Sequence, residues 1–143
     1  MAADRTASVT WSGSLLEGSG RIESVGSGAF GPLDVTWASR TEDSGGRTSP
    51  EELIAAAHAA CFSMAFSNVL AKAGSPPDRL ETSATVTFVP GTGITKSALT
   101  VRGTVPGMDE SAFREAAEDA NANCPVSKAL AGGPEITLDA ALA

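Results

Sequence analysis

The chain has 143 residues, a length that fits one domain whose core needs no disulfide or metal to support it. Its 10 basic and 17 acidic side chains give a formal net charge of -7, which disfavours binding to nucleic-acid phosphates. One His and two Cys are too few ligands for a tetrahedral structural zinc site. We therefore expect a single domain over residues 1–143 that binds no nucleic acid, metal or cofactor.

The start of the chain, from Met1 to Arg5, has no apolar stretch that could serve as a secretion signal. This feature predicts a cytoplasmic protein. In that reducing compartment a pair of cysteines is more often catalytic or redox-active than structural.

Alternating apolar and polar residues in the first third of the chain predict half-buried strands. The first strand covers residues 7–12, with Val9 and Trp11 on its apolar face. A weak strand follows near residues 21–25, within a Gly- and Ser-rich stretch. A third strand begins at Leu33 and is expected to run to Arg40.

Residues 49–73 carry the strongest helix signals. Ser49 is a good N-cap, Pro50 suits the first helical position, Glu52 completes a capping box, and Gly74 ends the helix. No charge occurs from residue 53 to residue 71, which raises the question of a membrane span. The segment is rich in Ala, is interrupted by polar side chains and has acidic flanks, so a buried central helix is the better interpretation.

An apolar helix of this kind has more surface to bury than one small sheet can cover. The rest of the chain supplies little further helical material. We therefore infer a homodimer in which two such helices pack together.

The C-terminal half is predicted to begin with a hairpin. Strands near residues 80–88 and 94–105 flank a turn rich in Pro and Gly. An amphipathic helix over residues 109–121, a short helix over residues 126–131 and a closing strand over residues 136–142 follow.

Cys61 and Cys124 are the candidate nucleophiles, and their local settings differ. Cys61 lies in the middle of a helix, where the helix dipole gives little help, and a buried inert thiol is the commoner outcome there. Cys124 precedes Pro125 at a predicted helix start, so local physics makes it the more acidic thiol. Nothing local indicates that the two cysteines meet.

His58 lies three residues before Cys61, on nearly the same helix face. A Cys–His nucleophilic pair and a metal site shared by His58, Cys61 and Cys124 are both conceivable. The pair lacks an orienting third group and the metal site lacks a fourth ligand, so a histidine held in a packed core is at least as plausible. Taken alone, Arg40 could be solvated at the surface and Glu51 could simply favour the helix dipole.

Taken together, these residues identify a family. The run TSPEELIAAAHAACFSMA (residues 48–65), with NCPVS downstream (residues 123–127), closely resembles the OsmC/Ohr family of thiol peroxidases. The WSG start (residues 11–13) and the closing EITL (residues 135–138) also match, so the likeness covers nearly the whole chain. The OsmC branch is indicated because Arg40 is expected on the third strand. The Ohr branch has its Arg on the second strand, where this chain has Arg21.

The resemblance implies a fold, an activity and a set of roles. It implies an α+β fold with antiparallel sheets around a long buried helix, in an intertwined homodimer with active sites at the interface. It implies a stress-response enzyme that reduces organic hydroperoxides to alcohols and is recycled by a dithiol of the lipoyl type. By this resemblance Cys61 attacks the peroxide, Cys124 resolves the product as a disulfide, Arg40 activates the thiolate and Glu51 orients Arg40.

The chemistry accounts for these residue types. A thiol with a pKa of ~8.5 is only about 3 per cent ionised at neutral pH, and lowering that pKa by ~2 units takes about 2.7 kcal/mol. A cysteine in the middle of a helix needs a nearby cation to lower its pKa by this amount. An Arg suits this role because it stays charged when buried. Because Glu51 lies ~15 Å from Cys61 along one helix, we expect the Glu51 that serves Cys61 to come from the partner subunit.

The substrate is expected to be bulky and apolar, with Phe62, Met64 and Phe66 as an apolar wall. Two other functions stay open from the sequence. The first is a non-catalytic regulatory switch based on a Cys61–Cys124 disulfide. The second is a binding module with two inert thiols.

Overall fold

The computed structural model describes residues 1–143, which form two compact units, Met1–Pro50 and Glu51–Ala143. Each unit contains its own three-stranded sheet. That the two units constitute one domain stays a prediction.

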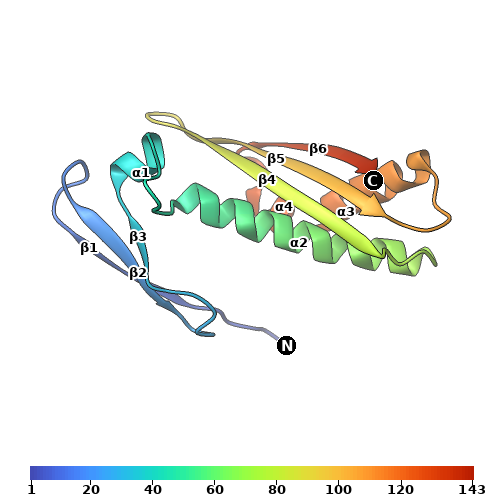
Figure 1. The fold of residues 1–143 in the computed structure, drawn as a ribbon, viewed down its shortest axis with the longest axis horizontal. Coiled ribbons are helices and arrows are strands. Elements are labelled where there is room, and N and C mark those ends of the chain that lie inside the picture. The colour runs from blue at the N-terminus through green and yellow to red at the C-terminus, as the bar shows by residue number, and fades with distance from the viewer. The chain divides into compact units, whose positions relative to one another are not determined.

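The sheet of the N-terminal unit has the antiparallel order β1-β2-β3 (Figure 1), formed by β1 (Ala7–Ser12), β2 (Ser19–Val25) and β3 (Leu33–Val35). Trp11 lies opposite Gly20, where an added Cβ would come within 2.6 Å of the Trp11 ring. All of β1 is exposed, with Val9 at 59% and Trp11 at 42%. The three strands are confirmed, but the prediction that β1 is half-buried is wrong for the single chain.

The third strand is shorter than predicted, and Arg40 does not lie on it. β3 ends at Val35 and is followed by a short helix, α1 (Trp37–Thr41), with Arg40 in its last turn. Thr36 caps α1 through a reciprocal capping box: the Ser39 amide donates to Thr36 Oγ1 at 3.0 Å and the Thr36 amide donates to Ser39 Oγ at 2.9 Å. These local hydrogen bonds outweigh the strand-like alternation of Leu33, Val35 and Trp37.

The long helix α2 (Pro50–Lys72) begins and ends close to the predicted positions. Gly74, at a φ of +84°, turns the chain out of the helix, and the Ser75 amide donates to the Leu70 carbonyl at 2.9 Å. Residues spaced by four form the buried face of α2: His58, Phe62, Phe66 and Leu70. This spacing places them in one row along the helix.

Length and composition alone would allow α2 to cross a membrane. However, the rings of Phe62 and Phe66 are completely buried in the hydrophobic core of the protein, as is the side chain of Leu70. The apolar helix therefore provides the core of the C-terminal unit, as predicted. The opposite face stays exposed in the single chain, where Met64 is 74% exposed.

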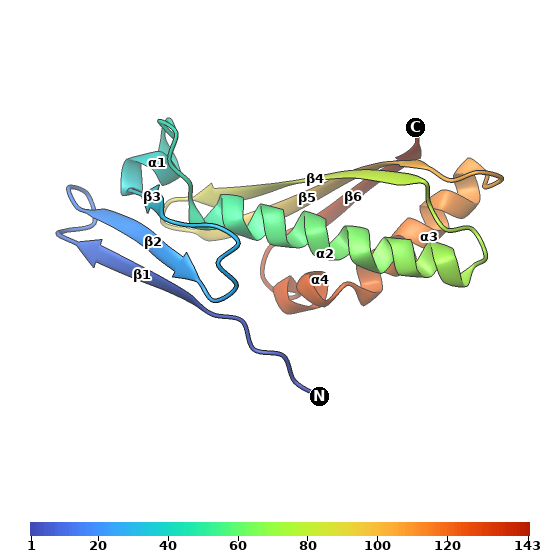
Figure 2. The ribbon, with the colours of Figure 1, turned by 60° about the horizontal axis from the view of Figure 1, so that its bottom comes forward.

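The sheet of the C-terminal unit has the order β4-β5-β6, and α2 crosses it together with α3 (Glu110–Asn123) and α4 (Pro125–Leu130). The hairpin of β4 (Arg79–Val89) and β5 (Gly93–Thr104) is confirmed, whereas β6 (Glu135–Leu142) pairs with β5 in parallel. The expectation of purely antiparallel sheets is wrong here, because α3 and α4 carry the chain back before β6 begins. Figures 1 and 2 show the three helices on the same face of this sheet.

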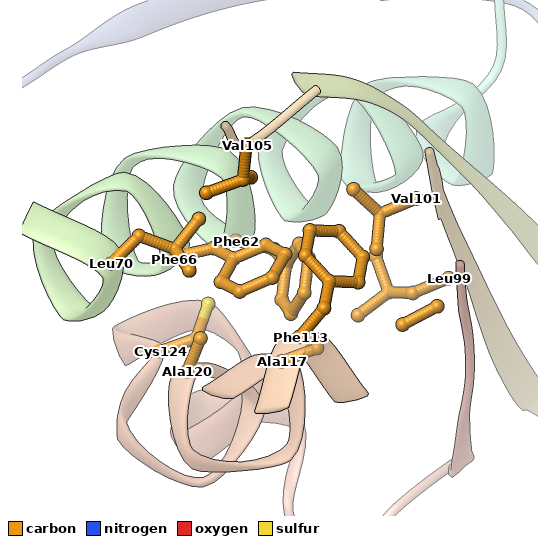
Figure 3. Packing of buried hydrophobic residues seen from close by; sticks show 11 residues of the cluster. Phe62, Phe66, Leu70, Leu99, Val101, Val105, Phe113, Ala117, Ala120 and Cys124 are labelled. Atoms are coloured by element: carbon orange, nitrogen blue, oxygen red, sulfur yellow. The ribbon is translucent and has the colours of Figure 1, made fainter. Parts of the chain in front are cut away.

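The core of this unit lies between the helices and β5 (Figure 3). Phe66 of α2 packs on Phe113 of α3 with ring centroids 4.9 Å apart, and Leu99 and Val101 of β5 complete the cluster. Gly103 leaves room for Phe113, because an added Cβ would lie 2.6 Å from that ring. This packing fixes the position of α2 relative to the chain segment that joins α3 to α4.

Candidate active site

The two cysteines, far apart in the sequence, meet in the C-terminal unit. Cys61 lies on α2 and is partly buried, and Cys124 is fully buried between α3 and α4. Both are free thiols, and they lie close enough for Cys124 to raise the pKa of Cys61. The sequence contained no local sign of this contact, which arises from the packing of α3 on α2 through the core.

Pro125 accounts for the position of Cys124. A residue that precedes a proline is disfavoured in the helical conformation, and Cys124 has φ -63° and ψ 121°. The residue therefore ends α3 and serves as the N-cap of α4, whose first helical position is Pro125. Figure 3 shows the sulfur of Cys124 pointing from this junction toward α2.

The surroundings of the two thiols make Cys124 the more acidic. Burial opposes ionisation of Cys124, but the Ser127 amide and hydroxyl, the Cys61 thiol and the Val126 amide together lower its pKa below the ordinary value. Burial raises the pKa of Cys61, and the neighbouring Cys124 raises it further against one hydrogen bond from the Val126 amide. The prediction that Cys124, at a helix start, is the more acidic thiol is confirmed. The C-terminal unit does not lower the pKa of Cys61 below its ordinary value.

His58 is a satisfied core histidine, as the more conservative interpretation predicted. Its Nδ1 lies 2.7 Å from Ser97 Oγ and its Nε2 lies 2.8 Å from Ser127 Oγ. Both ring nitrogens are therefore engaged by serine hydroxyls, and no Cys61–His58 pair forms. Neither serine was predicted as a partner of His58. Ser97 shares the alternate spacing of the buried apolar residues of β5 and Ser127 lies in the first turn of α4, and these positions were the signals that the sequence offered.

Stability is expected to fall as the pH is lowered through the titration range of His58. Burial lowers the pKa of His58 in the folded chain from its ordinary value of 6.5. Below that value the unfolded chain binds a proton that the folded chain does not, so the free energy of unfolding decreases by up to about 1.4 kcal/mol per pH unit. The decrease ends once the pH is below the folded pKa, because both states are then protonated.

Urea unfolding between about pH 7.5 and pH 5.5 measures this dependence. His58→Gln is the control, because glutamine does not titrate there while carboxylates contribute equally to both proteins. A slope that is identical in the two proteins would contradict the prediction.

The two remaining predicted site residues lie in different units. Arg40 belongs to the N-terminal unit, where its Cζ lies 5.9 Å from the centre of the Trp37 ring. Glu51 is in the first turn of α2 and is only 6% exposed. A carboxylate buried to this degree needs a hydrogen-bonding or charged partner. The structure brings Cys61 and Cys124 together, and the roles of Arg40 and Glu51 stay predictions.

Fold and site together define a class: an α+β protein with two neighbouring free thiols, one presented by a core helix and one by a helix start. Residues 42–139 match the family described as OsmC-like protein. The peroxiredoxin OsmC of Escherichia coli (strain K12) is 44% identical over 132 residues, which cover 90% of each chain. The chain belongs to the OsmC-like family, as the sequence motifs predicted.

Two further comparisons extend this result. The organic hydroperoxide resistance protein of Xanthomonas axonopodis pv. citri is 33% identical over 100 residues, 66% of this chain and 67% of that protein. The crystal structure of the organic hydroperoxide resistance protein OhrB of Bacillus subtilis matches with a TM-score of 0.68 and 27% identity, over 94% of this chain and 97% of that one. The predicted α+β fold and assignment as a thiol-dependent peroxidase are confirmed.

Proposed function

We propose that this enzyme reduces organic hydroperoxides to alcohols, with Cys61 as the attacking thiol and Cys124 as the resolving thiol. The observation that carries the proposal is that these two free thiols, 63 positions apart in the sequence, are neighbours within one packed unit. The names of the relatives, a peroxiredoxin and an organic hydroperoxide resistance protein, support the substrate class.

The proposed cycle has three balanced steps. The Cys61 thiolate attacks the outer peroxide oxygen, the O–O bond breaks, and the alkoxide leaves and takes up a proton to become the alcohol. The Cys124 sulfur then attacks the sulfenic acid of Cys61, forming the disulfide and releasing water. A dithiol of the lipoyl type reduces the disulfide by thiol–disulfide exchange and is itself oxidised. This last step places the enzyme in a reducing compartment such as the cytoplasm.

Activation of Cys61 is assigned to Arg40 in this proposal. Burial raises the pKa of Cys61, so its thiolate needs a cation that the C-terminal unit does not supply. An Arg suits this role because its planar guanidinium stays charged and can hold a carboxylate while it faces the sulfur. Glu51 is proposed as that carboxylate.

The enzyme is proposed to act as a homodimer. The outward face of α2 exposes Met64, and β1 exposes Val9 and Trp11, which are apolar surfaces that a second copy would cover. Glu51 is about 15 Å from Cys61 along α2, too far to serve it within one chain. We therefore propose that Glu51 of the partner subunit orients the Arg40 that serves Cys61.

The preferred peroxide is proposed to be large and apolar. Of the three residues expected to form an apolar wall, Phe62 and Phe66 are buried in the core, so only Met64 remains available on the surface of α2. The wall therefore consists of Met64 and neighbouring alanines. An apolar surface binds a bulky peroxide and offers hydrogen peroxide little.

Cumene hydroperoxide is expected to be consumed with a kcat/KM at least about tenfold higher than that for hydrogen peroxide, because one apolar group contributes ~1–3 kcal/mol. Peroxide loss with excess dithiothreitol measures both values. A preference for hydrogen peroxide would contradict the proposed substrate class. If neither peroxide is consumed while diamide still forms the Cys61–Cys124 disulfide, a non-catalytic redox switch becomes the better assignment.

A further inference from the structure

A buried polar network adjoins the resolving thiol. It runs from Ser97 on β5 through His58 on α2 to Ser127 on α4, and Ser127 Oγ donates to Asn121 Oδ1 at 2.7 Å. His58 and Ser97 are fully buried, and no buried side-chain nitrogen or oxygen lacks a hydrogen-bond partner. Burying polar groups beside an apolar core is costly unless each is satisfied, and here each is.

The proton positions in this network follow from its donors and acceptors. An amide oxygen can only accept, so the Ser127 proton is directed at Asn121 Oδ1. Ser127 Oγ must then accept a proton from His58 Nε2–H, and His58 Nδ1 accepts the hydroxyl proton of Ser97. This is the neutral form of the imidazole, and burial favours that form by lowering the pKa of His58.

Ser127 has a second acceptor close by. Ser127 is the third residue of α4, whose N-cap is Cys124, and from this place in the first turn its amide and hydroxyl favour the thiolate of Cys124. The thiol itself makes no capping hydrogen bond. The single hydroxyl proton of Ser127 can therefore serve Asn121 while Cys124 is a thiol and turn to the sulfur once Cys124 ionises.

We propose that His58 is a positioning residue for the resolving cysteine: its Nε2–H holds the Ser127 hydroxyl at the Cys124 sulfur, and that hydroxyl stabilises the thiolate that attacks the sulfenic acid. The inference rests on the proposed function and adds to it a residue that controls resolution. The titratable groups that face Cys124 are Cys61 on α2 and, through Ser127, His58.

The step served by this arrangement is the formation of the disulfide. The Cys124 thiol loses its proton, its sulfur forms a bond to the sulfur of Cys61, and the S–O bond of the sulfenic acid breaks. The departing hydroxide takes up a proton and leaves as water. The sulfur of Cys124 is oxidised and that of Cys61 is reduced, so no other oxidant or reductant takes part.

The test begins with the acidity of Cys124 in a Cys61→Ser background, followed by the ultraviolet absorbance of the thiolate. Ser127→Ala is expected to raise the pKa of Cys124 by about one unit, because it removes a hydrogen bond to a charged acceptor. His58→Leu is expected to raise the pKa of Cys124 as well, because the Ser127 hydroxyl is then no longer held in place. His58→Gln restores a value near the wild type, since the glutamine amide can still donate to Ser127.

Ser97→Ala is the matched control. It removes the same kind of hydroxyl from the other ring nitrogen of His58 and leaves the contact with Ser127 in place. We expect it to lower stability with little change in the pKa of Cys124. If Ser97→Ala and Ser127→Ala shift that pKa equally, or if neither shifts it, the network is merely structural and the proposal is wrong. Because Ser127→Ala removes only one oxygen, the test stands even if His58→Leu does not fold.

A second measurement follows the two chemical steps separately. With both cysteines present, one equivalent of cumene hydroperoxide is added and the Cys61 sulfenic acid is trapped with dimedone over time. Ser127→Ala is expected to form the sulfenic acid at the wild-type rate and to accumulate it, because resolution is slowed roughly tenfold. Equal trapping in both proteins would overturn the proposal. If the wild-type protein forms no sulfenic acid, the proposed function is wrong. The titration of Cys124 then still tests whether His58 controls the pKa of that thiol.

Discussion

Replacement of Cys61 by Ser is expected to abolish the consumption of cumene hydroperoxide, with a loss of more than about a thousandfold in rate. A serine hydroxyl is not ionised at neutral pH and its oxygen cannot be oxidised to an equivalent of sulfenic acid. Cys61 is partly exposed whereas Cys124 is fully buried, which supports the proposal that Cys61 is the thiol attacked first. The measurement is peroxide loss with excess dithiothreitol.

The matched variant is Cys124→Ser, which removes the other thiol of the same pair. Without dithiothreitol, it is expected to consume one equivalent of peroxide and to leave a Cys61 sulfenic acid that dimedone traps. The opposite pattern has a physical basis, because the surroundings of Cys124 lower its pKa while burial raises that of Cys61. If Cys124→Ser fails at the first equivalent and Cys61→Ser does not, Cys124 is the nucleophile and the assignment by family resemblance is reversed.

Elements set by local chemistry were predictable from the sequence. The limits of α2 follow from Pro50 at its start and Gly74 just after its end, and the hairpin of β4 and β5 follows from alternation on both sides of a turn. Asp109 caps α3 through its side chain, which accepts a hydrogen bond from the Ala112 amide at 2.8 Å. Each of these signals acts within a few residues and therefore needs no knowledge of the tertiary fold.

Two kinds of feature were not predictable: those in which one local signal outweighs another, and those that depend on packing between distant parts of the chain. Alternation from Leu33 onward is typical of a strand, yet the Thr36 and Ser39 capping box turns the chain into α1 and carries Arg40 with it. Burial of β1 was also predicted from alternation, which shows an apolar face but not whether the same chain covers it.

The candidate site likewise has one feature that local sequence predicted and others that only tertiary packing determines. The acidity of Cys124 followed from a proline and a helix start, both of them local. The contact between Cys61 and Cys124 required the packing of Phe66 on Phe113, which no local pattern reveals. The partners of His58 come from β5 and α4, so spacing along α2 predicted a core histidine but could not identify the two serines that bind it.

The second large effect is expected for Arg40→Ala. Cys61 lies mid-helix, burial raises its pKa, and the one hydrogen bond that lowers it comes from the Val126 amide. If Arg40 supplies the missing cation, its loss raises the pKa of Cys61 by ~2 units and lowers the rate with cumene hydroperoxide about a hundredfold at neutral pH. The diagnostic measurement is the pH–rate profile of sulfenic acid formation, whose midpoint moves upward while the limiting rate at high pH is partly recovered.

Two variants separate this effect from a general loss of positive charge. Arg40→Lys keeps the charge without the planar fork, so it is expected to fall between Arg40→Ala and the wild type. Arg21→Ala is the matched control, because Arg21 lies on β2 and forms an exposed ion pair with Asp34 at 3.2 Å, which contributes little energy. A pH–rate profile that moves with Arg21→Ala and not with Arg40→Ala would assign activation to the second strand, the arrangement that the resemblance associates with the Ohr branch. A profile that moves with neither would leave Cys61 activated from another source, and the role proposed for Glu51 of the partner subunit would be lost with that of Arg40.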